Sequence, residues 1–151
     1  MPQSLAAVYI HLVFSTKNRK PFLATPVMQK KTFAQLAVIS ANLDCPALLV
    51  GGQPDHIHLL GRLGRTISQA EWAKEVKRVS SIWVGEQGAA YADFAWQAGY
   101  GTFSVSHSNL NAVKKYILDQ DNHHKKITFQ DEYRALLKKH QIEYDERYVW
   151  D

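Results

Sequence analysis

Gly51 to Leu63 reads GGQPDHIHLLGRL and carries the pattern around which the rest of the chain is arranged. Side chains of a strand alternate between its two faces, so His56 and His58 project together while Ile57 and Leu59 point the other way. Two neutral imidazoles on one face suit a single divalent metal, and the apolar pair would fix the strand to a core. A polar strand face that binds no metal is the alternative interpretation of the same triplet.

The composition predicts one globular domain. The 151 residues are 46% hydrophobic and 21% charged, which suffices for a real core and excludes extended disorder. The net charge of +4 favours a polyanionic partner without requiring one. Cys45 is the single cysteine, which excludes an internal disulfide and fits a reducing cytosol. Because no apolar run approaches the ~18 residues of a membrane span and the N-terminus lacks signal-peptide features, we expect a cytoplasmic protein without membrane association.

The spacing of apolar residues predicts a β-α-β-β-α-β order followed by helices. Thr25-Pro26 and the Ser68–Glu71 capping box mark two helix starts, and residues 51–54 form a hairpin turn. We therefore expect an α+β, ferredoxin-like split βαβ fold, with helices on one face of an antiparallel sheet and the other face left for a site or partner. Strands are expected at residues 5–15, 47–50, 55–63 and within 94–105, and helices at 25–42, 68–83, 109–123 and 129–140.

A second group of candidate residues lies on the helix expected at about 109–123. Tyr116 and Gln120 are four residues apart and share one helical face. The tyrosine phenol can attack phosphorus and form a covalent link, and the glutamine carbonyl oxygen can bind a metal. Packing or hydrogen bonding is the alternative role of the tyrosine.

Two motifs resemble those of a known family. Pro54-Asp55-His56-Ile57-His58-Leu59-Leu60 resembles the His-hydrophobic-His signature of HUH endonucleases. Tyr116-Ile117-x-x-Gln120-x-x-His123-His124 resembles the tyrosine helix of the single-tyrosine HUH transposases of the smallest bacterial insertion sequences, which include REP-associated tyrosine transposases. Segments 11–19, 99–106 and 145–150 extend the resemblance. Asp119 departs from the pattern, since family members often carry asparagine there, and it adds a negative charge near the expected site.

The resemblance implies that residues 1–151 form a single HUH domain that nicks and transfers hairpin-bearing single-stranded DNA, with a C-terminal helix and tail at about 128–151. It implies Mg²⁺ or Mn²⁺ held by His56, His58 and Gln120, and Tyr116 as the nucleophile that forms a 5′-phosphotyrosine link. Three neutral ligands would leave the full charge of the ion to polarise the phosphate. The resemblance also implies a homodimer, whose sites could form within one subunit or across two.

Basic residues in three segments are expected to bind DNA phosphates, with exposed aromatic residues stacking on bases. The third group lies on the helix face opposite Trp72 and Val76, and a solvated surface is the alternative there. His123 and His124 fit either a role near the site or one at a helix end. The basic candidates are Lys17, Arg19 and Lys20, then Arg62 and Arg65, then Lys74, Lys77 and Arg78.

Three other functions fit parts of the pattern. A nucleotide hydrolase of the histidine-triad type needs a third alternating histidine, but the chain has Leu60 there. A domesticated relative that binds structured DNA or RNA without cutting is the main alternative. Asp119 keeps it open, and the intact set of His56, His58, Tyr116 and Gln120 argues against it. A metal-free structural dimer would leave the pairing of Tyr116 with Gln120 unexplained.

Overall fold

Four antiparallel strands form one sheet in the order β2-β3-β1-β4. The structure is a computed structural model that describes residues 2–151. Helix α1 connects β1 to β2 and helix α2 connects β3 to β4, which is the split βαβ arrangement. The predicted fold class is therefore confirmed. The elements are β1 (Tyr9–Ser15), α1 (Pro26–Asn42), β2 (Ala47–Gln53), β3 (His56–Arg62), α2 (Gln69–Gly85) and β4 (Gly101–Val105).

The chain after β4 is helical. It forms α3 (Leu110–Leu118), α4 (Gln120–His123) and α5 (Phe129–Lys139). The helix expected at 109–123 is divided, because Asp119 between α3 and α4 has non-helical dihedral angles of −93° and 16°. Within residues 2–151, no helix has the length and apolar character that crossing a membrane requires. Three short 3-10 helices complete the chain: η1 (Lys17–Arg19), η2 (Ala89–Tyr91) and η3 (His107–Asn109).

The helix starts follow the local sequence. The Thr25 hydroxyl accepts the backbone N–H of Met28, and the Ser68 hydroxyl accepts that of Glu71. Each bond satisfies an amide that the first helical turn would otherwise leave without a partner. Both predicted N-caps are confirmed.

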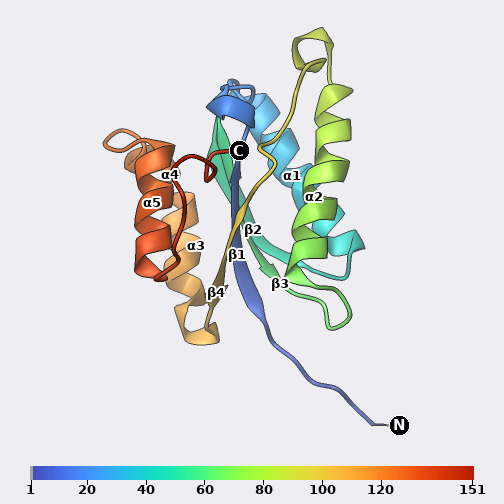
Figure 1. Ribbon diagram of the computed structural model, residues 1–151. Helices are drawn as coiled ribbons and strands as arrows, with labels where there is room; N and C mark the ends of the chain where they lie inside the picture. The colour runs from blue at the N-terminus through green and yellow to red at the C-terminus, as the bar shows by residue number, and fades with distance from the viewer. Residues whose placement is uncertain (1) are drawn as a thin grey trace.

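The sheet lies between two layers of helices (Figure 1). On one face, α1 and α2 pack on Leu12, Phe14 and Ile57 and form the larger core. On the other face, Ile117 of α3 packs with Leu60, and Phe129 of α5 packs with Val13. The expectation that helices would leave this second face open is wrong, because α3 and α5 have apolar stripes of their own to bury.

Two element boundaries differ from the sequence-based expectation. β2 continues through Gly51 to Gln53, which pair with His58 and His56, so the hairpin turn is only Pro54-Asp55. The strand expected within 94–105 is confined to residues 101–105. Ahead of it, Trp96 forms an isolated antiparallel bridge with Thr16, and its side chain is buried in the core.

Candidate active site

The two histidines of the HUH triplet lie on the second face of the sheet, under α3, α4 and α5. β3 is a central strand, and His56 and His58 pair with Ser15 and Val13 of β1. Both imidazoles are fully buried. The strand alternation thus directs Ile57 into the larger core and both histidines toward the C-terminal helices.

The structure brings all four predicted site residues together within one chain. Gln120, the first residue of α4, lies with its Oε1 2.8 Å from Nε2 of His56. The ring of Tyr116 lies edge-on to His58, with 5.8 Å between the ring centroids. The break at Asp119 separates the tyrosine from the glutamine into two helices, yet both side chains reach the histidines.

Glu132 of α5 lies at the centre of this group. Its Oε1 is 3.1 Å from Nε2 of His58, and its Oε2 accepts the side-chain N–H of Gln120 at 2.8 Å and the hydroxyl of Tyr116. Glu132 is not among the site residues predicted from the sequence. The available signal was a charged residue next to Tyr133 within the apolar stripe of an amphipathic helix, where burial requires a partner.

Three further residues hold the rings and the amide in place. His11 Nε2 lies 2.7 Å from Nδ1 of His58, and Asp55 Oδ1 lies 2.7 Å from Nδ1 of His56. His124 Nε2 lies 3.1 Å from the Oε1 atoms of both Gln120 and Glu132. Such partners on the far nitrogen orient a metal-binding imidazole and fix its tautomer.

Burial and hydrogen bonding set the protonation of the nucleophile and the carboxylate. Burial raises the pKa of Tyr116 well above its usual range, and the charge of Glu132 adds to this shift. Burial opposes ionisation of Glu132 as well, but hydrogen bonds from His124, His56 and His58 hold its pKa well below the usual range. A neutral phenol therefore donates to an ionised carboxylate.

The histidines differ in protonation. Burial lowers the pKa of His58 and of His11, so both imidazoles are neutral. Burial would also lower the pKa of His56, but hydrogen bonds to Asp55 and Glu132 raise it to about 9. A metal at His56 therefore has to displace a proton.

The donor atoms fit a divalent metal ion. One ligand atom each from His56, His58 and Glu132 lies within 4.8 Å of the others, and Gln120 offers an amide oxygen beside them. Two imidazole nitrogens with carboxylate and amide oxygens form a mixed set that suits a borderline-hard ion. A bound ion would replace the hydrogen bonds that now join these four side chains.

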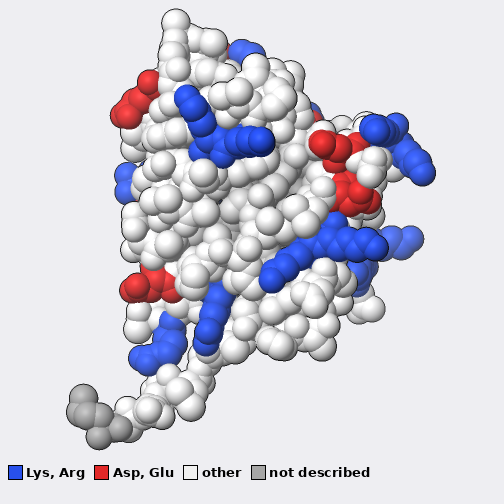
Figure 2. All heavy atoms as spheres, turned by 180° about the vertical axis from the view of Figure 1, so that it is seen from behind, with Lys and Arg blue, Asp and Glu red and all other residues white. Residues whose placement is uncertain are grey.

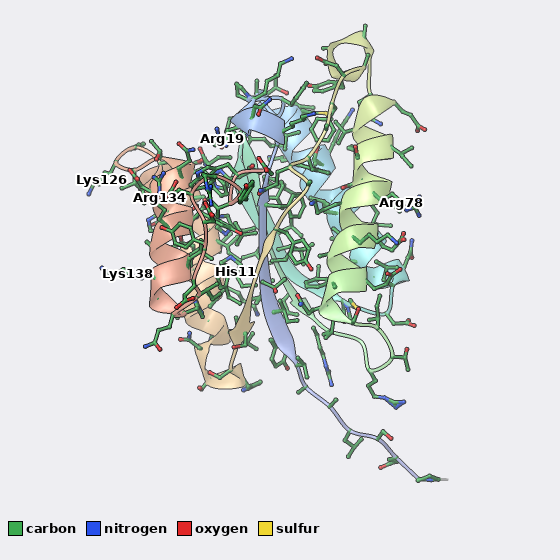
Figure 3. The ribbon with its side chains drawn as sticks, viewed as in Figure 1. His11, Arg19, Arg78, Lys126, Arg134 and Lys138 are labelled. Carbon is green, nitrogen blue, oxygen red and sulfur yellow. The ribbon has the colours of Figure 1, made fainter. Side chains whose placement is uncertain are left out.

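Solvent reaches this buried group through a pocket of about 450 Å³ between β4, α3 and α5. Tyr116, Glu132 and His11 are among the residues that line it, and Glu132 and His11 are buried. In Figure 3, His11 projects from β1 toward the C-terminal helices, which places it under this pocket.

The predicted DNA-binding residues do not gather on one surface. Lys74 and Arg78 lie on α2, across the sheet from Tyr116, and Arg78 pairs with Glu75 at 2.7 Å. Figure 3 shows Arg78 and Lys126 on opposite sides of the molecule. On the face in Figure 2, Lys and Arg side chains are spread over several elements with acidic side chains between them.

Several of the basic candidates already have partners in the chain. Lys77 donates to the backbone oxygens of Ala98 and Gly99 at 2.8 Å, and burial lowers its pKa to about 8. Lys20 pairs with Asp93 at 3.1 Å. Others contact backbone oxygens or an aromatic ring: Arg62 donates to Ala6, Arg65 to Ser4, and Arg19 lies over the ring of Trp150, while Lys17 is exposed.

The fold and part of the sequence match known transposases. Residues 4–120 match the family model of IS200-like transposases. A protein from Deinococcus radiodurans R1, described as a transposase, has 18% sequence identity and a TM-score of 0.62 over 80% of this chain and 95% of that chain. A REP-associated tyrosine transposase bound to a REP hairpin has 13% identity and a TM-score of 0.60 over 84% of this chain and 74% of that chain. No curated protein matches the chain. Because the family model spans well over half of its length, the chain belongs to the family of IS200-like transposases.

Proposed function

We propose that the protein is a metal-dependent endonuclease and strand transferase that acts on hairpin-bearing single-stranded DNA through a 5′-phosphotyrosine intermediate. The observation that carries this proposal is the convergence of His56, His58, Gln120 and Glu132, with the hydroxyl of Tyr116 beside them. Buried groups that bind a cation next to a nucleophile suit phosphoryl transfer. Membership of a transposase family makes DNA the expected substrate.

Glu132 accounts for the proton movements at Tyr116. The Tyr116 oxygen attacks the scissile phosphorus, and its proton passes to Glu132 Oε2, which already accepts that hydroxyl. The bond from phosphorus to the 3′ oxygen breaks, and that oxygen takes up a proton from solvent, so the leaving strand ends in a 3′-hydroxyl. When a 3′-hydroxyl attacks the phosphotyrosine, it releases its proton to solvent, and the phenol leaves and recovers a proton from Glu132. The phosphodiester bond energy is kept throughout, so joining needs no ATP.

The ion would be held by His56, His58, Gln120 and Glu132. Bound there, a divalent ion supplies Lewis-acid polarisation of the phosphate and stabilises the leaving oxygen. Mg²⁺ or Mn²⁺ is proposed, and the two imidazoles make Mn²⁺ the better ion for a first assay. Glu132 adds a negative charge to the three ligands predicted from sequence, which would strengthen cation binding.

The DNA is proposed to approach Tyr116 from the side of the C-terminal helices. Exposed Lys125 and Lys126 lie in the loop between α4 and α5, and exposed Lys17 follows the site end of β1. Lys74 and Arg78 would contact a more distant part of the same DNA. The homodimer stays a prediction, which light scattering after size-exclusion chromatography would test.

A denaturing gel tests the proposed activity directly. The protein is incubated with Mn²⁺ and a labelled hairpin oligonucleotide taken from the DNA that flanks its own gene. The wild type and the control variant Tyr144→Phe, at an exposed tyrosine, are expected to form a covalent adduct, whereas Tyr116→Phe and His58→Ala are not. An adduct with Tyr116→Phe would disprove the assigned nucleophile. Tight hairpin binding without any adduct in the wild type would favour the non-cleaving alternative.

A further inference from the structure

We infer that the pocket between β4, α3 and α5 is a nucleobase subsite that takes the base flanking the phosphate attacked by Tyr116. The inference rests on the proposed function for the position of that phosphate. It adds a binding site with its own ligand class, because most residues that line the pocket are not cation-binding side chains; Glu132 belongs to both groups. The lining includes Phe103 and Val105 of β4, Val113 of α3, Leu136 and Lys139 of α5, and His140, which follows α5.

The size and the aromatic lining of the pocket suit a nucleobase. Its volume of about 450 Å³ falls within the roughly 300–1,000 Å³ range of small-ligand pockets. Four aromatic rings of the lining lie near one another. Between ring centroids, His11 is 6.2 Å from Tyr116 and 6.1 Å from Phe103. The ring of Phe103 is in turn 4.6 Å from that of His140. Every base has a π face, so such a row accepts a base of any identity.

The charges along the pocket suit a nucleotide. Lys139 is the lysine of the lining, and it lies on the exposed face of α5. Glu132 is the acidic residue of the lining, and its carboxylate already accepts from Tyr116 and Gln120. The wall therefore offers apolar contact to a base and a lysine to a phosphate of the same nucleotide, while the Glu132 carboxylate is engaged by Tyr116 and Gln120.

Because the proposed nucleophile Tyr116 lines the pocket, its position determines which base of the DNA would enter. Tyr116 and Glu132 both line the pocket, and the hydroxyl of Tyr116 donates to the carboxylate of Glu132. The cation-binding groups of His56 and His58 are fully buried behind them. A base is joined to its phosphate through a single sugar, so a phosphate beside the phenol leaves the pocket within reach of a flanking base. Stacking there would hold the scissile bond in line for attack.

A fluorescence experiment tests the subsite without requiring cleavage. Tyr116→Phe protein with Mn²⁺ is titrated into hairpin oligonucleotides that carry 2-aminopurine at one position near the cleavage site. One position that flanks the scissile phosphate should lose fluorescence on binding, because its base stacks on the rings. Adding Ala135→Trp, which places an indole in the lining, should weaken this response about tenfold while hairpin binding stays within about threefold. Ala34→Trp, at an exposed alanine of α1 on the other layer, is the matched control.

A second variant and a cleavage assay separate the possible failures. Ala112→Trp enters the same pocket from α3, and thermal unfolding checks that each variant is folded. If no flanking position responds, or if the response persists in both pocket variants, the subsite is disproved. An absent adduct with wild-type protein would instead count against the proposed function, since the fluorescence response does not depend on cleavage. A response confined to positions far from the scissile phosphate would also overturn the subsite.

Discussion

Glu132 shows how one buried carboxylate can organise a site. An isolated charge in a protein interior is costly, so its neighbours have to compensate it. Here Tyr116 and Gln120 donate to one oxygen, and His58 and His124 lie 3.1 Å from the other. The same contacts fix the nucleophile, the amide ligand and one histidine relative to each other. Loss of the charge should therefore disturb the chemistry more than the fold.

Replacing Glu132 by glutamine keeps the size of the side chain but removes its charge and its ability to accept a proton. We expect covalent adduct formation to fall by about 10²–10⁴-fold, the usual range for removal of a general base. Hairpin affinity should stay within about threefold, since the side chain is buried and is not among the lysines proposed to contact DNA phosphates. Rates measured by denaturing gel test this, with Glu143→Gln at an exposed position as the control. Wild-type rates in Glu132→Gln would rule out the proton-acceptor role.

The raised pKa of His56 predicts a pH-dependent metal affinity. With a pKa of about 9 this imidazole is protonated at neutral pH, and a metal ion must displace that proton. Below pH 9 the apparent affinity for Mn²⁺ should therefore rise with pH by up to about tenfold per unit, and level off above it. Calorimetry in buffers of different ionisation enthalpy would count the released protons. Asp55→Asn, which removes one cause of the raised pKa, should shift the rise to lower pH; an unshifted rise would contradict this explanation.

Local sequence patterns were informative for some site residues and silent for others. The period of a strand places His56 and His58 together, and the period of a helix relates Tyr116 to Gln120, so short spacings predict both pairs. The position of Glu132 depends on how α5 packs over the sheet, which no spacing within α5 determines. Its burial is a tertiary property, and its polar neighbours come from elements far apart in the chain.

At the scale of elements, the approach of α3 to β2 sets where Tyr116 lies. Gly51 of β2 makes this approach possible: a Cβ there would lie 2.7 Å from the side chain of Ile117 and 3.2 Å from its backbone oxygen. The sequence analysis assigned Gly51 to a turn, because glycine followed by Gly52 and Pro54 usually ends a strand. The break at Asp119 was missed because the residues around it suit a helix.

Gly51→Ala should separate α3 from β2. The added methyl group meets backbone as well as side chain, so we expect a loss of about 1–3 kcal/mol in the free energy of unfolding and slower adduct formation through displacement of Tyr116. Gly85→Ala is the matched control, since its nearest neighbour would be the Tyr91 backbone oxygen at 3.8 Å. Urea unfolding and the adduct assay measure the two effects. Equal stability of both variants would show that α3 adjusts without cost.

At the scale of the whole molecule, the sheet separates two sets of basic residues. Lys74 and Arg78 lie on the α2 side, whereas Lys125 and Lys126 lie beside the candidate active site. The net charge of +4 is small. The positions of the basic residues should therefore influence the approach of DNA more than the net charge does. Composition predicted a polyanionic partner, but only the layered fold shows which lysines share a side with Tyr116.

The salt dependence of hairpin binding should distinguish the two sides. Each lost contact to a single-stranded phosphate reduces the slope of log K against log salt by roughly 0.7. We expect Lys125→Ala with Lys126→Ala to flatten the slope by about 1.4 if both contact single-stranded DNA. Lys74→Ala with Arg78→Ala should change the slope less, because Arg78 is engaged with Glu75. A larger change in slope for Lys74→Ala with Arg78→Ala than for Lys125→Ala with Lys126→Ala would place the single strand on the α2 side. Fluorescence anisotropy at several salt concentrations measures both slopes.

Helix α5 lies beyond residue 120, where the match to the family ends, yet it contributes a carboxylate to the candidate active site. A frameshift or stop codon after position 120 would therefore leave both histidines, the tyrosine and the glutamine encoded while removing Glu132. Such an allele would look intact by its shared motifs and, under the proposed mechanism, encode an inert protein. Loss of function of this gene could thus begin with a mutation in its last fifth, which would leave unchanged the residues by which its relatives are recognised.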